Sequence, residues 1–159
     1  MVPSTPEPEP LRLYGQIAEQ ARLDWDWVES ELVAAGTYWV VAATTTHPHP
    51  RPVWGVWAND GLELSIGSPV LAAALEANPR CTVHLDSGTD VVVVEGLAQR
   101  GSEPDPQLVA AYDAKYEWQY SYEEYGPFTR INPTLVRAWR SAGWAGREGF
   151  QSVGRWRFA

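Results

Sequence analysis

Large apolar side chains recur at helical spacing near the start of the chain. Four of them follow one another at i, i+3, i+7 and i+8: Trp25, Val28, Leu32 and Val33. This spacing places them on one face of a helix. Asp24 can cap the start of that helix and Gly36 can end it. We therefore expect a helix between about Leu11 and Ala35.

Runs of β-branched and aromatic residues dominate the rest of the chain, and short turn sequences separate them. Seven such runs are predicted to be strands: Thr37–Thr45, Pro52–Ala58, Leu62–Ile66, Cys81–Asp86, Thr89–Ala98, Thr129–Arg140 and Gln151–Phe158. The sequence Asn-Asp-Gly between the second and third runs is typical of a tight hairpin turn.

Two further helices interrupt the strands. Ser68 and Pro69 are typical of a helix start, Val70–Ala77 are helix formers, and the proline after Asn78 ends the segment. Another helix is predicted over Asp105–Glu117, which carries large side chains at helical spacing. Many short strands with few helices predict a mainly β (α+β) fold built on a small closed or half-open β-barrel.

Length and composition narrow the class of protein. A chain of 159 residues has room for one compact domain, expected over residues 11–159 after a disordered Pro/Glu-rich tail at residues 1–10. Twelve basic and twenty acidic residues give a net charge of −8, which disfavours nucleic acid or an anionic membrane as a partner. No apolar run approaches the ~20 residues of a membrane helix, and no secretory signal precedes the domain, so a cytoplasmic protein is expected. The single cysteine, Cys81, excludes an internal disulfide and a Cys-rich metal site.

The segment Arg51–Trp57 is apolar on both of its faces. Strand side chains alternate between two faces, and here neither alternate set is polar. Both faces are therefore expected to be covered, one by the barrel interior and the other by a second surface. A partner subunit is the simplest candidate for that second surface.

Five short segments have the order and spacing of a known family: Arg51–Trp57, Asn78–Arg80, Val91–Gly96, Lys115–Trp118 and Arg155–Phe158. Together they resemble the pyridoxamine 5′-phosphate oxidase-like family of flavin- and deazaflavin-dependent split β-barrel oxidoreductases. The resemblance implies a homodimeric FMN-binding split β-barrel with a cofactor site at the subunit interface. It also implies hydride transfer between FMN or the deazaflavin coenzyme F-420 and a small planar apolar substrate.

The resemblance assigns the cofactor groove to eleven residues, some of them from the second subunit: Arg51, Pro52, Val53, Trp54, Ser65, Ile66, Gly67, Ser68, Trp118, Arg155 and Trp156. The family usually carries an Arg and a Lys at the start of the following helix, where they hold the cofactor phosphate. In this chain Val70 and Leu71 stand at those positions, and Pro69 removes a backbone N–H. A second possibility is therefore a cofactor-independent split-barrel protein, either a biosynthetic enzyme or a binder of an apolar ligand.

Three residues are candidates for proton transfer, above all in a cofactor-free enzyme: His84, Glu95 and Tyr116. His84 and Asp86 lie on one strand face, either as an acid–base pair or as solvated residues at a sheet edge. Glu95 is either a desolvated acid or the exposed end of its strand. Tyr116 either lines a substrate site or packs.

Two further groups have open roles. The His-Pro-His-Pro sequence at residues 47–50 could supply metal ligands, but its prolines favour a stiff turn and no third ligand is near, so no metal is expected. Arg155 and Arg157 share a strand face, where they could receive a carboxylate or phosphate or pair with acidic side chains.

Overall fold

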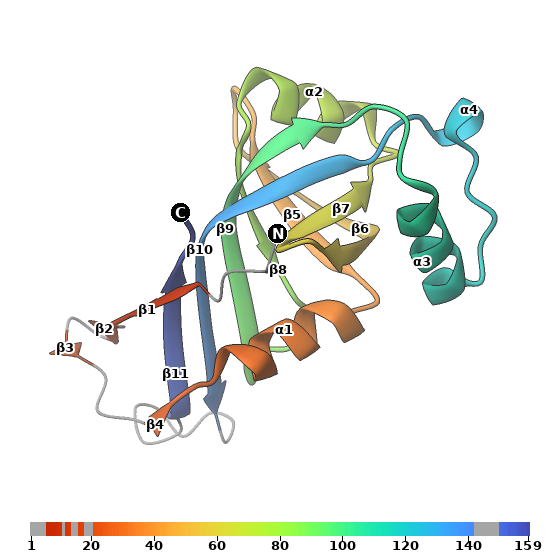
Figure 1. The fold of residues 1–159 in the computed structure, drawn as a ribbon. Coiled ribbons are helices and arrows are strands. Elements are labelled where there is room, and N and C mark those ends of the chain that lie inside the picture. Colours follow the sequence, from red (N-terminus) through yellow and green to blue (C-terminus); the bar gives the residue numbers. More distant parts are fainter. Residues whose placement is uncertain (1–5, 11, 14–15, 18–20, 142–149) are drawn as a thin grey trace.

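The computed structural model describes residues 6–10, 12–13, 16–17, 21–141 and 150–159 (Figure 1). Six strands form the barrel: β5 (Tyr38–Ala43), β6 (Pro48–Ala58), β7 (Gly61–Ser65), β8 (Arg80–His84), β9 (Asp90–Arg100) and β10 (Thr129–Ser141). They follow the order β10-β7-β6-β5-β8-β9, every pair is antiparallel, and β9 pairs back with β10. The ring of strands is therefore closed, and the predicted mainly β barrel is confirmed.

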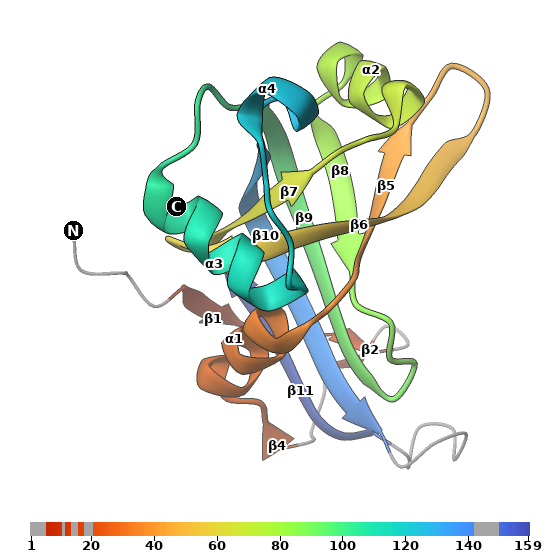
Figure 2. The ribbon, with the colours of Figure 1, turned by 90° about the vertical axis from the view of Figure 1, so that its right-hand side faces the viewer.

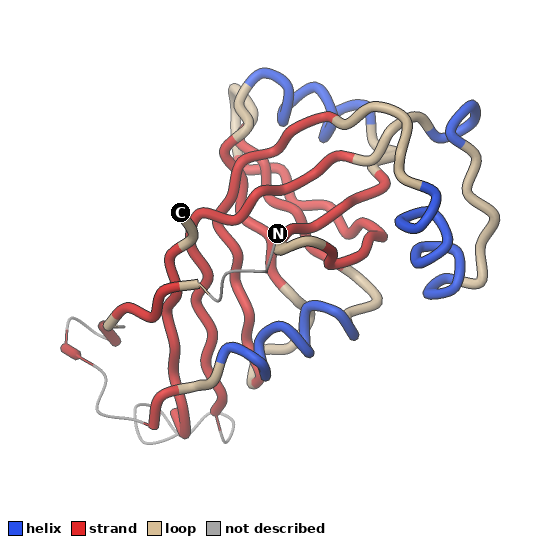
Figure 3. The backbone as a smooth tube through the Cα atoms, viewed as in Figure 1, coloured by secondary structure: helices blue, strands red, loops and turns tan. Residues whose placement is uncertain are grey.

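In the described part of the chain, five more strands lie outside the barrel: β1 (Glu7–Glu9), β2 (Arg12–Leu13), β3 (Gln16–Ile17), β4 (Ala21–Arg22) and β11 (Phe150–Arg157). Figure 3 shows β10 and β11 continuing side by side beyond the barrel. β1 pairs with β11, and Glu9 forms ion pairs with Arg155 at 3.1 Å and Arg157 at 2.7 Å. These three residues of β1 are therefore paired, although they fall within the tail expected to be disordered.

The core is made by the inward-facing side chains of the strands. Its fully buried members include Tyr38, Val40, Leu62, Leu64, Val83, Val92, Val94, Ile131 and Val136. α1 (Trp25–Ala34) and α2 (Pro69–Ala77) cover opposite ends of the barrel (Figures 1 and 2). Val28 and Leu32 of α1 and Leu71 of α2 are buried in this core.

The helices differ from their predicted ranges mainly at one end. α1 begins at Trp25, directly after Asp24, and not near Leu11. Its Val33 is 54% exposed, so the buried stripe of this helix is narrower than the sequence spacing indicates. α2 begins as predicted, with Ser68 as N-cap and Pro69 in the first turn. α3 (Pro106–Tyr116) and the short α4 (Tyr122–Tyr125) complete the helices of the described residues.

The prediction of a stiff turn at residues 47–50 is wrong for three of these four residues. Pro48, His49 and Pro50 begin β6 and pair with β5. β6 pairs with β7 only from Trp54 onward, so its first half has one free edge. Prolines at alternate positions direct their missing N–H groups to the same side, and a free edge tolerates this loss.

The outer face of β6 is partly covered by the chain itself. Val56 packs with Tyr112 of α3 and with Phe128 in a second cluster of buried residues. The expectation that a partner subunit covers this face is therefore corrected at Val56. Trp54 lies two residues before Val56, on the same face of β6, and remains 43% exposed.

Close approach between β6 and β7 requires glycine at position 55. A Cβ atom there would lie 2.5 Å from the carbonyl oxygen of Glu63, well inside contact distance. The turn between these strands places Asn59 and Asp60 at positive φ, as the Asn-Asp-Gly sequence predicts. Among the described helices, none has the length and apolar character needed to cross a membrane.

Candidate functional site

An aromatic pocket of about 340 Å³ lies between β6, the start of α2 and the segment that joins α3 to α4. Ten residues line this aromatic pocket: Arg51, Pro52, Val53, Trp54, Ser65, Gly67, Ser68, Tyr112, Trp118 and Tyr125. Eight of the eleven residues assigned to the cofactor groove are among them. Tyr112 and Tyr125 were not assigned. The helical spacing of Tyr112 and Tyr116 was the available sequence signal for Tyr112, since it places both rings on one face of α3.

Two exposed tryptophans form the walls of the aromatic pocket. Trp54 stacks on Tyr116 with ring centroids 4.6 Å apart and an interplanar angle of 3°. Trp118 stands edge-on to Trp54 at 5.8 Å and 84°. Trp54 and Trp118 are 43% and 42% exposed, which is high for the residue type with the largest apolar surface. Because Tyr116 covers one face of the Trp54 ring, the remaining apolar surface is available to a flat ligand.

The end of α3 hydrogen-bonds to the edge of β6 where β5 is no longer its neighbour. The pairing of β5 with β6 stops at Val53, so no strand of the described residues pairs with Gly55 on that side. Its N–H donates to the Tyr116 hydroxyl at 2.9 Å, and Lys115 Nζ donates to its carbonyl at 3.0 Å. The Tyr116 hydroxyl is also within donating distance of the Gly55 carbonyl at 2.8 Å. These contacts hold α3 against the barrel and fix the Tyr116 ring under Trp54.

Burial sets the protonation of the groups around this edge. Lys115 Nζ also donates to the Tyr38 hydroxyl at 3.0 Å, and burial lowers the pKa of Lys115 to about 8. The pKa of Tyr38 is raised, first by burial and then by Tyr116. Burial likewise raises the pKa of Tyr112 and of Tyr116. The three tyrosines are therefore neutral hydrogen-bonding groups at neutral pH.

The start of α2 forms the polar side of the aromatic pocket. The Ser68 hydroxyl accepts a hydrogen bond from the Leu71 N–H at 3.3 Å. Val70 is 55% exposed, whereas Leu71 is fully buried in the core. The two positions matched to the family's Arg and Lys therefore differ, since a side chain at 70 is exposed and one at 71 lies inside the barrel.

The side chains of the other three assigned residues do not line the aromatic pocket in this chain. Ile66 packs against the main core. Trp156 is buried and packs edge-on against Trp25 at 5.4 Å. Arg155 and Arg157 both pair with Glu9, so pairing with acidic side chains is the role that this chain shows for them.

The candidate proton-transfer residues also lie apart. His84 is on β8, which pairs with β5 on one side and β9 on the other. The expectation that His84 and Asp86 lie at a sheet edge is therefore wrong for His84. The His84 ring lies parallel to that of Trp39, and the Trp39 indole N–H donates to the Asp86 carboxylate. Trp39 therefore contacts both members of the predicted pair, and none of the three lines the aromatic pocket.

Glu95 lies in the middle of β9, and its carboxylate pairs with Arg137 of β10. It is therefore not the end of its strand, and its side chain, which is 43% exposed, is not a desolvated acid. Tyr116 is the candidate proton-transfer residue nearest the aromatic pocket, and its hydroxyl is committed to Gly55 and to Gly36, whose carbonyl it meets at 3.0 Å.

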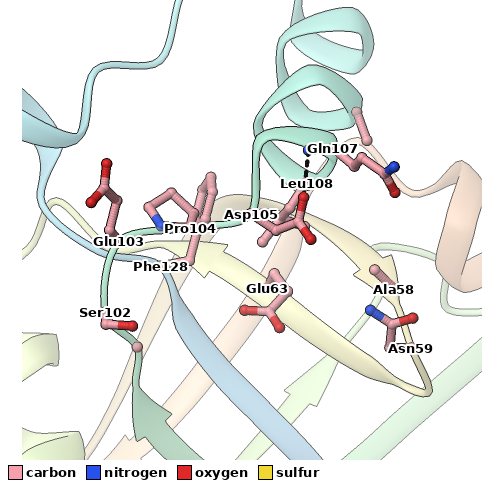
Figure 4. A pocket seen from close by; sticks show the side chains of 12 residues that line it. Ala58, Asn59, Glu63, Ser102, Glu103, Pro104, Asp105, Gln107, Leu108 and Phe128 are labelled. Atoms are coloured by element: carbon pink, nitrogen blue, oxygen red, sulfur yellow. Dashed lines mark hydrogen bonds between the residues drawn. The ribbon is translucent and has the colours of Figure 1, made fainter.

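An acidic hollow of about 420 Å³ lies at the other end of α3 (Figure 4). Three carboxylates line it: Glu63, Glu103 and Asp105. Asp105 accepts a hydrogen bond from the Gln107 N–H at 2.7 Å, and Glu63 pairs with Arg130 at 2.7 Å. Among the described residues, no three His, Cys, Asp or Glu side chains are placed to hold a metal ion.

Comparison with known proteins finds similarity in the fold. The chain matches no protein-family model, and no curated protein is significantly similar in a search of those proteins. A FAD-binding protein from Mesorhizobium loti is 16% identical with a TM-score of 0.57, over 84% of this chain and 94% of that one. A candidate pyridoxamine 5′-phosphate oxidase from Listeria innocua is 18% identical with a TM-score of 0.56, over 71% and 95%.

An F-420 reductase is 16% identical with a TM-score of 0.56, over 68% of this chain and 94% of that one. These identities are low, so the similarity concerns the backbone arrangement. The fold expected from the sequence is therefore confirmed: the chain is a split β-barrel with the backbone arrangement of these solved structures.

Proposed function

We propose that the aromatic pocket binds a flavin-type ring and that the protein transfers hydride between this ring and a small planar apolar substrate. The observation that carries the proposal is the convergence of Arg51–Trp54, Ser65 and Ser68 with Trp118 around one pocket. The solved structures with this fold include a FAD-binding protein and an F-420 reductase, which supports the same class of ligand. FMN and the deazaflavin coenzyme F-420 are the two candidate cofactors.

The residues of the aromatic pocket fit the ring part of such a cofactor. Trp54 and Trp118 offer exposed aromatic surface, on which a planar heteroaromatic ring stacks favourably. Ser65 and Ser68 supply hydroxyl groups, and Arg51 is the one cationic side chain among the ten that line the pocket. When bound, the cofactor supplies the hydride donor or acceptor. The protein would orient the ring against the exposed surfaces of Trp54 and Trp118.

A homodimer is part of this proposal. The outward side chains Trp39 and Val41 of β5 and Val93 of β9 are only half-buried in a single chain, and β8 lies between these two strands. A second copy on this face would cover them, and it is the proposed source of the Arg155 side chain at the other chain's pocket. Light scattering tests this part separately, since a monomeric mass at micromolar concentration would contradict it.

Ligand titration tests the ring site directly. FMN and coenzyme F-420 are titrated separately into the purified protein while the ring fluorescence is followed. Binding of either with a Kd below about 10 μM supports the proposal, whereas no binding at about 100 μM would contradict it. For the ligand that binds, anaerobic reduction followed by mixing with candidate planar substrates measures hydride transfer.

A second candidate function follows from the start of α2. Val70 and Leu71 offer no charge for a phosphate, which favours a cofactor-free enzyme or a binder of an apolar ligand. In a cofactor-free enzyme His84, Glu95 or Tyr116 would transfer protons, and of these Tyr116 contacts a residue of the aromatic pocket, Trp54. Failure of both cofactors to bind, together with binding of an unphosphorylated aromatic compound, would favour this alternative.

A further inference from the structure

The start of α2 offers few backbone donors to an anion. Pro69 has no N–H, and the N–H groups of Leu71 and Ala72 donate to the hydroxyl and carbonyl oxygens of Ser68 at 3.3 and 3.0 Å. Within this described turn, the N–H of Val70 is the group that remains. A helix start binds an anion through several free N–H groups acting together. This helix start is therefore a weak place for a phosphate.

The side chains beside the aromatic pocket add little positive charge. Val70 is exposed and uncharged, and Leu71 points into the core. Arg51 lines the pocket, but one of its terminal nitrogens already donates to the Pro50 carbonyl at 2.8 Å. Tight phosphate sites rely on several charge-assisted hydrogen bonds, often bidentate ones from arginine. Here at most one such group is available from the described lining.

The aromatic pocket offers well-ordered aromatic side chains to the ring of a ligand. Trp54 is held parallel to Tyr116, and Trp118 closes the pocket at right angles to it. The Tyr116 hydroxyl is tied to Gly55, so this arrangement exists before a ligand binds. A pre-arranged stacking surface costs little ordering when a ring enters.

We propose, resting on the proposed function, that contacts to the ring set the affinity of this pocket and that a phosphate on the ligand's tail contributes little. The ligand class is accordingly a planar heteroaromatic ring whose tail need not be phosphorylated. Riboflavin and FMN have the same ring and differ by one phosphate, so they form a matched pair of probes. Riboflavin is expected to bind about as tightly as FMN, within a factor of about three.

Parallel titrations of riboflavin and FMN into the full-length protein, followed by ring fluorescence, test this inference. A ratio of dissociation constants below about ten supports it. FMN binding more than about ten times tighter than riboflavin would overturn it and leave the proposed function standing. Absence of binding by either compound at about 100 μM would overturn this inference, and the proposed function would fall with it only if coenzyme F-420 also failed to bind.

A lysine at position 70 supplies the missing charge where the side chain is exposed. Val70→Lys is expected to tighten FMN binding about tenfold and to leave riboflavin binding unchanged. Val33→Lys on α1 is the matched control, because Val33 is 54% exposed on a helix at the opposite end of the barrel and Val70 is 55% exposed. An unchanged FMN affinity in Val70→Lys, or an equal gain in both variants, would overturn the placement of the ligand's tail beside α2.

Discussion

Two hollows at opposite ends of α3 are built from different chemistry. The acidic hollow at the start of α3 is lined by carboxylates, two of which already have partners: Asp105 caps the helix and Glu63 pairs with Arg130. The aromatic pocket at the end of α3 is walled by Trp54 and Trp118, whose rings keep more than two fifths of their surface exposed. Paired polar groups at a surface need no ligand, whereas large exposed aromatic faces gain free energy when a ligand covers them. The comparison therefore favours the aromatic pocket as the functional site.

Tyr112 links the two hollows, and its removal is expected to have the largest effect. Its ring is buried, lines the aromatic pocket and packs against Phe128, which lines the acidic hollow. Tyr112→Ala should destabilise the protein by about 3–5 kcal/mol, as removal of a large buried ring does. Urea unfolding measures this loss. Tyr122→Ala is the control, since Tyr122 is exposed, and a comparable loss in that variant would contradict the assignment.

The walls of the aromatic pocket should control ligand binding. Trp54→Ala and Trp118→Ala are each expected to weaken binding of a flavin ring by about tenfold or more, because each removes a stacking surface. Fluorescence titration measures this effect. Glu103→Ala, in the acidic hollow, should leave the affinity unchanged. If all three variants bound the ring with the same affinity, the assignment of ring binding to the aromatic pocket would be contradicted.

The ion pair in the acidic hollow should matter for stability and not for binding. Glu63→Gln removes the charge that faces Arg130, whose guanidinium keeps its bonds to the carbonyls of Ala58 and Asn59. We expect a loss of about 1 kcal/mol in the free energy of unfolding. Ring affinity is expected to stay within twofold of wild type, which is about 0.4 kcal/mol. A large loss of ring binding in this variant would indicate that the ligand binds in the acidic hollow, contrary to the proposal.

The titration of Lys115 should make the stability of the protein depend on pH. Its pKa is lowered to about 8 in the folded protein, from an ordinary value near 10.5, because it is partly buried. Between these two values the unfolded chain binds more protons, so stability should rise with pH above about 8. Comparison of wild type with Lys115→Met between about pH 7.5 and 9.0 isolates this contribution and stays about one unit below the ordinary tyrosine pKa near 10. A wild-type protein that lost stability relative to the variant over this range would contradict the burial of the amine.

Runs of β-branched and aromatic residues between turn sequences were enough to predict the strands of the barrel, because these residues are the ones that pack its shared core. The same local information predicted the cap at Ser68 and the hairpin turn at Asn59 and Asp60. It could not show that Leu71 faces inward while Val70 faces out, because the orientation of a short helix depends on what it packs against. The turn expected at residues 47–50 failed for a similar reason, since a free sheet edge accepts alternate prolines.

The candidate site divides in the same way. Residues on β6 and at the start of α2 were assigned to the cofactor groove from the sequence and lie together in the structure. Tyr112 and Tyr125 reach the aromatic pocket from α3 and α4, which lie far along the chain from β6, so the sequence alone did not connect them with the cofactor groove. His84 and Asp86 have the spacing of a pair, but the Trp39 indole from a neighbouring strand accounts for the contacts of both.

A crystal structure of the protein grown with riboflavin tests the central claim most directly. The account predicts electron density for a flat ring against Trp54 and Trp118, with the tail directed toward Ser68 at the start of α2. A ring found in the acidic hollow, or an aromatic pocket left without ring density when the solution titration shows saturation, would contradict the account.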